Sequence, residues 1–234
     1  SLLRDKFISC CVLGNDYGPL EQCTIRQAEL LGIRTVRIQD GTNVAPPPLD
    51  ALARGHALLL GDGGCQLNCV WASSIAEGFR TRGISGRLSV SGCPRYDALP
   101  QRRPPKEAQS VKTVLVATQC FEKFGLLTLG TELALYDHII RIVLRRNDTR
   151  VILKLHPQTM TPEPYYVLSQ TYNGLVSVDT ETDSLSLLSQ VDALLTITST
   201  IAIEAALMGV PTRRLDSLLA KYSREQFQQY HEEF

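Results

Sequence analysis

The sequence predicts an α/β protein made of two Rossmann-like domains, each built around a parallel sheet. Short apolar runs alternate with helical segments along all 234 residues, which is the pattern of βαβ units. Glycine or polar residues follow each apolar run, as they do where buried strands end in loops. A polar, proline-rich stretch then separates two such series. We therefore expect a partial N-terminal domain at 1–100, a linker at 101–110 and a C-terminal domain at 111–234.

Composition excludes several classes of protein. Hydrophobic residues make up 44% of the chain and charged residues 21%, as in ordinary globular proteins. Lys plus Arg (24) balance Asp plus Glu (24), so no overall positive field favours nucleic acid. No apolar run approaches the roughly 20 residues of a membrane-spanning helix, and no signal segment opens the chain. We expect a cytoplasmic protein, with a peripheral position at the inner membrane face as the alternative.

Seven cysteines are scattered through the chain, and their odd number argues against a disulfide framework. Cys65 and Cys69 could lie one helical turn apart, but no second pair or neighbouring histidine would complete a tetrahedral metal site. We expect reduced thiols, no metal and no cofactor.

Each half contains a series of expected elements. In the first half, strands are expected at 7–13, 35–38, 69–72 and 88–90, with helices at 19–31, 51–60 and 73–82. In the second half, strands are expected at 111–117, 151–155, 175–178, 193–197 and 210–215, with helices at 127–146, 165–170, 184–190 and 201–208. Asp183 is expected to cap the helix at 184–190.

Ligands of open parallel sheets bind beyond the carboxyl ends of the strands. Thr198, Ser199 and Thr200 follow a predicted strand and open a helix, where free N–H groups and hydroxyls could hold a phosphate. The alternative is an ordinary helix cap. Glu204 lies one turn further along, where it could bind ribose hydroxyls or be a solvated glutamate.

His156 follows the run VILKL, and Pro157 restricts its loop. An imidazole at this position could donate to a phosphate or neutralise a leaving group, and Lys154 would add positive charge. The alternative is a structural histidine with its bonds satisfied internally.

Asp40 ends a first-half strand, between Gln39 and Gly41, and could act as general base on an incoming hydroxyl. The alternative is a turn aspartate. Asp16 is a weaker candidate of the same kind, and Arg95 could contact an anion or pair with a neighbouring carboxylate.

Taken together, these segments resemble a known superfamily. RIQDG, CVWA and VSGCPRYDAL precede the proline-rich hinge, and VLVATQ, VILKLHP and DALLTITSTIAIEAALMGVP follow it. Their order is similar to that of GT-B glycosyltransferase-like enzymes of bacterial surface (capsular) polysaccharide synthesis, in the sialyltransferase-like and CDP-glycerol transferase-like branches. UDP-N-acetylglucosamine 2-epimerases are more distant relatives. The resemblance covers nearly the whole chain and implies two Rossmann-like domains that face a cleft.

The resemblance also implies roles for particular residues. His156, Ser199 and Thr200 would hold the donor phosphates, Glu204 the ribose, and Asp40 would be the base of an acidic-acidic-Gly motif. Thr118 and Gln119, at the end of VLVATQ, join this predicted donor site. Gln39 departs from the motif, because it occupies the first acidic position.

The predicted function is metal-independent transfer of a sugar or related group from a CMP-, CDP- or UDP-linked donor to a glycan or other hydroxyl acceptor. A nucleotide-sugar 2-epimerase and a non-catalytic nucleotide-sugar binding subunit are the alternatives. Complete enzymes of this kind have strands before the one at 7–13, so the first domain is expected to be truncated. A missing N-terminal segment or a partner chain would then complete it.

Overall fold

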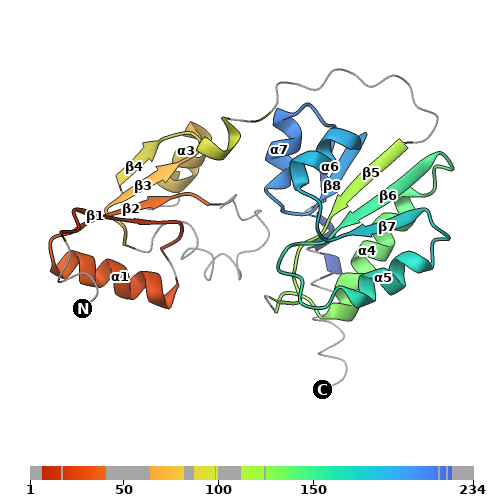
Figure 1. The fold of residues 1–234 in the computed structure, drawn as a ribbon, viewed down its shortest axis with the longest axis horizontal. Coiled ribbons are helices and arrows are strands. Elements are labelled where there is room, and N and C mark those ends of the chain that lie inside the picture. The colour runs from red at the N-terminus through yellow and green to blue at the C-terminus, as the bar shows by residue number, and fades with distance from the viewer. Residues whose placement is uncertain are drawn as a thin grey trace. The chain divides into compact units, whose positions relative to one another are not determined.

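The computed structural model describes residues 7–16, 18–40, 64–81, 87–97, 99, 112–123, 125–215, 217–219 and 221–222. The chain divides into two compact units, Ser1–Asp97 and Ala98–Phe234. Each unit contains one parallel sheet with helices, so the predicted α/β class is confirmed (Figure 1). The expected linker at 101–110 and the expected helix at 51–60 lie outside the described residues.

The first unit has a four-stranded sheet in the order β1-β2-β3-β4, and all its strands are parallel. The strands are β1 (Cys10–Leu13), β2 (Arg34–Ile38), β3 (Leu67–Val70) and β4 (Arg87–Val90). Helix α1 (Pro19–Leu30) connects β1 to β2, α3 (Ser73–Thr81) connects β3 to β4, and the 3-10 helix η2 (Pro94–Tyr96) follows. Because the strand order never reverses, right-handed connections bring α1 and α3 to the same face of this sheet.

The two faces of this sheet differ in burial. Val70 is buried against Phe79 of α3, and the register-paired residues Arg37 and Asn68 are both fully buried. The opposite face carries Val12, which is 58% exposed, and Ile38, which is 43% exposed. The core of the first unit therefore lies on the helix-covered side.

Two first-half strands differ from the prediction. β1 begins at Cys10 rather than at Phe7, whose side chain is fully exposed. β3 ends at Val70, so the prediction that Trp71 and Ala72 belong to it is wrong. The backbone N–H of Trp71 donates to Oε1 of Gln39 at 3.0 Å, and this side-chain bond takes Trp71 out of the β ladder.

The second unit has a five-stranded parallel sheet in the order β7-β6-β5-β8-β9. Its elements follow the predicted order closely. They are β5 (Lys112–Ala117), α4 (Leu129–Val143), β6 (Thr149–Lys154), α5 (Glu163–Gln170), β7 (Val176–Asp179), α6 (Ser184–Gln190), β8 (Ala193–Thr196), α7 (Ile201–Leu207) and β9 (Thr212–Arg214). Most strands begin or end within two residues of the expected positions. β9 is at the sheet edge, as predicted, but it has only three residues.

Side-chain caps decide where two helices of the second unit begin. The hydroxyl of Thr128 accepts a bond from the N–H of Thr131, so α4 starts at Leu129 rather than at 127. The carboxylate of Asp183 accepts a bond from the N–H of Ser186, which confirms the predicted cap of α6.

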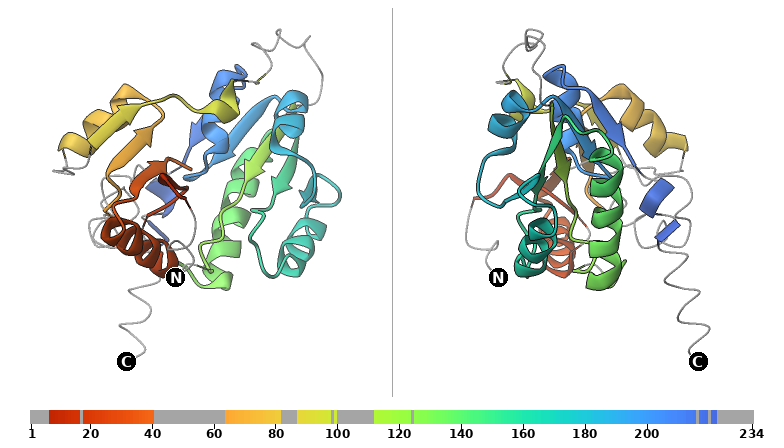
Figure 2. Two further views of the ribbon diagram at one scale, coloured as in Figure 1. Left: turned by 60° about the vertical axis from the view of Figure 1, so that its left-hand side comes forward. Right: turned by 90° about the vertical axis from the view of Figure 1, so that its right-hand side faces the viewer.

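The direction of the chain reverses once across the second sheet. β5, β6 and β7 run outward to one edge, and the chain then returns to place β8 on the other side of β5. With right-handed connections, α4 and α5 cover one face while α6 and α7 cover the other, as Figures 1 and 2 show from different sides. The space beyond the ends of β5 and β8 is thus a topological switch point, where ligands of such sheets bind.

An apolar cluster of β5, β8 and α7 residues lies next to this switch point. Leu115 and Ala117 of β5 pack with Leu194 of β8 and with Ile201 and Ala205 of α7. In the part of the chain that the structure describes, no helix has the length and apolar character needed to cross a membrane.

Candidate functional site

Three strand exits lie level with one another at the switch point of the second unit. Ala117, the last residue of β5, is in register with Lys154 at the end of β6 and with Thr196 at the end of β8. The residues that follow these strand ends are therefore neighbours. They include Thr118, Gln119, His156 and Thr198, all of which the sequence predicts as donor-site residues.

Hydrogen bonds join these four residues across the sheet. The N–H of His156 donates to the hydroxyl of Thr118 at 3.0 Å. The hydroxyl of Thr198 donates to Oε1 of Gln119 at 3.2 Å. The N–H of Gln119 donates to the hydroxyl of Tyr136 on α4 at 2.7 Å. These bonds thus fix the exits of β5, β6 and β8 relative to one another and connect them to α4.

The surroundings of His156 select one tautomer of its ring. The backbone N–H of Gln158 donates to Nδ1 at 3.1 Å, so Nδ1 is an acceptor and the proton lies on Nε2. The thiol of Cys120 is 3.4 Å from the same Nδ1. Partial burial, and then the charge of Lys123, hold the pKa of His156 below its ordinary value. His156 is therefore neutral near pH 7 and offers Nε2–H as a donor.

Lys154 has an internal partner that sequence reasoning did not identify. Its Nζ lies 2.8 Å from Oδ1 of Asp179, the register partner at the end of β7. Asp179 also accepts bonds from the N–H and the hydroxyl of Thr182. Burial alone would raise the pKa of Asp179, but the bonds from Lys154 and Thr182 hold it below its usual value. The charge of Lys154 is thus balanced within the second unit.

At the start of α7, one hydroxyl caps the helix and another does not. Thr200 is the N-cap residue, but its side chain makes no capping bond. The hydroxyl of Ser199 instead accepts a long bond of 3.4 Å from the N–H of Ile201. Glu204 is only 2% exposed, so a ribose contact would require its carboxylate to be uncovered. The roles of Ser199, Thr200 and Glu204 in donor binding remain predictions.

The candidates in the first unit lie near the ends of its strands. Asp40 follows β2 and is exposed, whereas Gln39 is 2% exposed. The side chain of Gln39 accepts from the N–H of Trp71, and its carbonyl accepts from the indole N–H of Trp71 at 2.9 Å. Gln39 therefore joins two strand exits. Gly41 lies outside the described residues, and Arg95 is exposed on η2.

Asp16 occupies a different environment from the one predicted. It is fully buried and forms an ion pair with the fully buried Arg37, with 3.4 Å between Oδ1 and Nε. This pair lacks hydrogen-bond geometry. A carboxylate in this position suits an internal ion pair rather than a base that meets an acceptor, because no acceptor hydroxyl can reach it without local opening.

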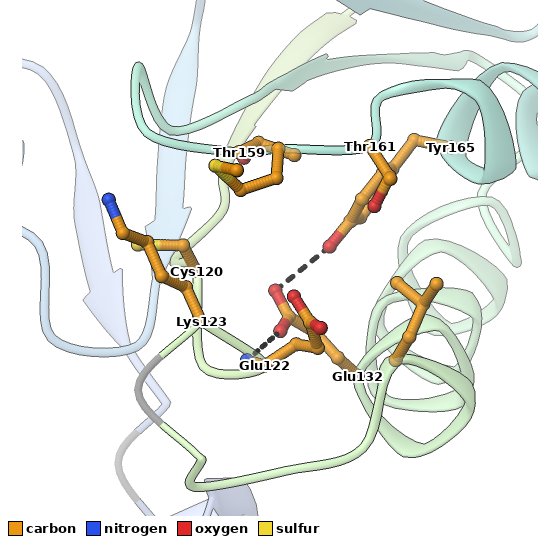
Figure 3. A pocket seen from close by; sticks show the side chains of 9 residues that line it. Cys120, Glu122, Lys123, Glu132, Thr159, Thr161 and Tyr165 are labelled. Carbon is orange, nitrogen blue, oxygen red and sulfur yellow. Dashed lines mark hydrogen bonds between the residues drawn. The ribbon is translucent and has the colours of Figure 1, made fainter.

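A small pocket beside His156 contains polar residues that the sequence analysis missed. Cys120, Lys123, Glu132, Thr159 and Tyr165 are among its lining residues (Figure 3). Glu132 is fully buried and accepts bonds from the N–H of Glu122 and the hydroxyl of Tyr165. The available signal was a glutamate within the apolar face of a long helix, since such residues usually have partners. Across the ranges described above, no group of three or more His, Cys, Asp or Glu side chains could hold a metal ion.

Comparisons with known proteins give one family match and a common fold. The sequence profile of the alpha-2,8-polysialyltransferase family matches residues 97–207, slightly less than half of the chain. No curated protein sequence matches significantly.

Solved structures resemble the chain at low sequence identity. The S. aureus MnaA–UDP structure has a TM-score of 0.62 and 13% identity, over 88% of this chain and 58% of that one. The UDP-GlcNAc 2-epimerase from Neisseria meningitidis bound to UDP-GlcNAc has a TM-score of 0.60 and 14% identity, over 96% and 68% of the two chains. The GtfA/B complex has a TM-score of 0.50 and 9% identity, over 94% and 50%. At such identities the likeness concerns the fold, and the chain spans 58% of the length of MnaA.

Proposed function

We propose that this chain, a member of the GT-B-like superfamily with the fold of that group, carries the donor site of a nucleotide-sugar glycosyltransferase. The reaction would transfer a sugar to a hydroxyl acceptor during surface polysaccharide synthesis, on the cytoplasmic side of the membrane. The match of residues 97–207 to a polysialyltransferase profile supports a transferase over an epimerase. One observation carries the proposal: His156 stands at the switch point, where its backbone N–H donates to Thr118 and its Nδ1 accepts the N–H of Gln158, so that Nε2–H is the donor offered to a ligand.

The donor's phosphate would meet hydrogen-bond donors rather than a metal ion. In our proposal, Nε2–H of His156 and the hydroxyls of Ser199 and Thr200 bind the phosphate oxygens. α7 has only seven residues, so the hydroxyls at its start matter more here than a long helix dipole. As the bond between the sugar carbon and the phosphate oxygen breaks, negative charge grows on the nucleotide. Fixed donors at that oxygen stabilise the transition state.

The acceptor's proton would pass to Asp40. This exposed carboxylate follows β2 in the first unit, and in our proposal it removes the proton as the acceptor oxygen bonds to the sugar carbon. The nucleotide then leaves with the electron pair of the broken bond. Gln39 would keep the Asp40 segment in place through its bonds to Trp71.

Nucleotide binding is the first test. In a thermal-shift panel of CMP, CDP, UDP and GDP, we expect at least one nucleotide to raise the unfolding midpoint with the logarithm of its concentration. His156→Gln keeps an N–H near the position of Nε2, whereas His156→Asn does not. We expect about tenfold weaker binding for the asparagine variant than for the glutamine variant. No shift with any nucleotide would overturn the proposal.

Turnover separates the transferase from its two alternatives. The structural likeness to 2-epimerases favours epimerisation as the second candidate. An epimerase converts UDP-GlcNAc without an acceptor, so NMR of the nucleotide sugar incubated alone would detect it. A binding subunit would bind nucleotide but show no turnover with any acceptor. For a transferase, Asp40→Ala should abolish transfer and leave nucleotide affinity unchanged.

A further inference from the structure

We propose that Glu132 is a positioning residue, which fixes residues 118–123, the segment after β5, and thereby keeps Cys120 against the imidazole of His156. The activity part of this inference rests on the proposed function, whereas its structural part does not.

Two buried side chains of α4 anchor this segment on either side of Cys120. Tyr136 and Glu132 lie one helical turn apart, and both are 0% exposed. The hydroxyl of Tyr136 accepts the N–H of Gln119 at 2.7 Å. Oε2 of Glu132 accepts the N–H of Glu122 at 2.8 Å. The backbone is thus held one residue before Cys120 and two residues after it.

The second oxygen of Glu132 is also used. The hydroxyl of Tyr165, on α5, donates to Oε1 at 2.9 Å, and Figure 3 shows both bonds converging on the carboxylate. Tyr165 is itself 2% exposed. A single side chain therefore ties the segment after β5 to two helices.

Packing alone does not account for a carboxylate at this place. Burial raises the pKa of Glu132, and the hydrogen bonds from Glu122, from Tyr165 and from the backbone of Phe121 oppose that effect. An apolar side chain would fill the same space without a desolvation cost, but it could not accept either bond. What the carboxylate contributes is the position of the segment.

The segment reaches His156 through Cys120. The thiol is 6% exposed and lies 3.4 Å from Nδ1, which also accepts the N–H of Gln158. If the anchor at Glu122 is lost, the thiol is free to move off the ring. The imidazole then loses one of the contacts that determine its orientation, and with it the direction of the Nε2–H bond to the donor.

Two substitutions separate positioning from mere burial. In Glu132→Gln, the amide oxygen still accepts the N–H of Glu122, and the amide nitrogen donates to the oxygen of Tyr165 once that hydroxyl turns. In Glu132→Ala, both donors are left without this acceptor. We therefore expect the glutamine variant to behave like the natural protein and the alanine variant not to.

Alkylation of Cys120 gives a readout that needs no nucleotide. Cys120 is the only cysteine in residues 98–234, so peptide mapping after iodoacetamide treatment isolates its rate. We expect Glu132→Ala to raise that rate about tenfold, with faster hydrogen exchange at the amides of Gln119 and Glu122. The amides of β5 and β8 should keep their protection. Nucleotide affinity should fall about tenfold for Glu132→Ala and recover in Glu132→Gln.

Asp137→Ala is the matched control. Asp137 is a carboxylate on the same helix, and it also binds a tyrosine, since it accepts the hydroxyl of Tyr172 at 2.5 Å and Nε of Arg141 at 2.6 Å. Within the described ranges, it forms no hydrogen bond or ion pair with the segment after β5, so Cys120 should alkylate at the natural rate in this variant.

Three outcomes would overturn the positioning role of Glu132: an unchanged Cys120 alkylation rate in Glu132→Ala, an equal increase in Asp137→Ala, or no rescue by Glu132→Gln. If the amides of β5 and β8 also lose hydrogen-exchange protection in Glu132→Ala, that variant is replaced in the experiment by Tyr165→Phe. We then expect Cys120 to be alkylated about two- to fivefold faster in Tyr165→Phe than in the natural protein, on the order of one lost hydrogen bond. If no variant binds nucleotide, including the natural protein, the proposed function fails while the alkylation result still decides the role of Glu132.

Discussion

The hydroxyl of Thr118 accepts a hydrogen bond from the backbone N–H of His156 at 3.0 Å, which joins the residue after β5 to the loop after β6. The N–H of Thr118 in turn donates to the carbonyl of Lys154 at 2.9 Å. This reciprocal pair sets where the imidazole stands relative to β5 and β8, the two strands that flank the switch point. The geometry of the candidate site thus depends on a threonine as much as on the histidine.

Thr118→Val tests this link with almost no change in volume. The valine cannot accept the N–H of His156, so we expect a loss of about 1–3 kcal/mol in the free energy of unfolding and weaker nucleotide binding. Thr118→Ser keeps the hydroxyl and should retain most of both. Urea unfolding and titration calorimetry would measure these effects. Equal losses in the two variants would show that the methyl group matters instead.

His156 should make stability depend on pH near neutrality. Burial and Lys123 lower its pKa in the folded protein below the ordinary 6.5, so the unfolded chain binds more protons in the window between the two values. Stability therefore rises with pH through this window, is complete above the unfolded pKa, and is lost as the pH falls.

Comparison of the natural protein with His156→Gln isolates this effect. Unfolding free energies measured from about pH 5 to about pH 8 should converge between the two proteins as the pH falls. A constant difference across the range would contradict the expectation. Asp179 titrates in a separate window, because its pKa lies below 3.8.

Lys154 and Asp179 should be energetically coupled. The side chains are 9% and 21% exposed, and 2.8 Å separates Nζ from Oδ1. Removing either partner leaves the other charge poorly solvated, so Lys154→Met and Asp179→Asn should each destabilise the second unit by about 1–3 kcal/mol. The double variant should cost less than the sum of the two, as a double-mutant cycle would measure. Additive losses would mean that Lys154 is free to bind an anionic ligand.

Gln39→Glu would restore the acidic residue expected at this position, but we predict that it destabilises the first unit. The side chain is 2% exposed, and a carboxylate buried there would pay a desolvation cost of about 1–3 kcal/mol at neutral pH. A glutamate with a raised pKa is protonated as the pH falls, so stability should recover toward acid pH.

Trp71 is the only tryptophan and lies against Gln39, so its fluorescence reports this unfolding directly. Gln39→Met, which cannot accept the N–H of Trp71, is the control that measures how much this hydrogen bond contributes to the free energy of unfolding. A variant Gln39→Glu as stable at neutral pH as the natural protein would contradict the burial argument.

Much of the fold could be predicted from local patterns. The alternation of apolar runs with amphipathic segments indicates parallel sheets, and the cap at Asp183 could be predicted because its carboxylate bonds only three residues ahead. The end of β3 could not be predicted in the same way. Trp71 has a side chain typical of strands, but its N–H donates to Oε1 of Gln39, 32 residues away, rather than to the β ladder.

The candidate site shows the same limit. Polar residues after Ala117, Leu155 and Ile197 could be predicted to meet, because parallel strands bring their carboxyl ends to one edge. Their partners could not. Asp16 and Lys154 are charged residues of the kind found in binding sites, yet they form ion pairs with Arg37 and Asp179. Glu132 is connected to the site only through buried hydrogen bonds.

By itself, the sequence determines the α/β class, the order of the elements and the set of polar residues at the strand exits, since these depend on side-chain periodicity and on turns between neighbours. The tertiary structure decides which of those polar groups remain available to a ligand. His156 offers Nε2–H as a donor because Gln158 and Cys120 contact its other nitrogen, whereas the charge of Lys154 is balanced by Asp179. Such pairing depends on strand order and burial, which bring together residues that are distant along the chain.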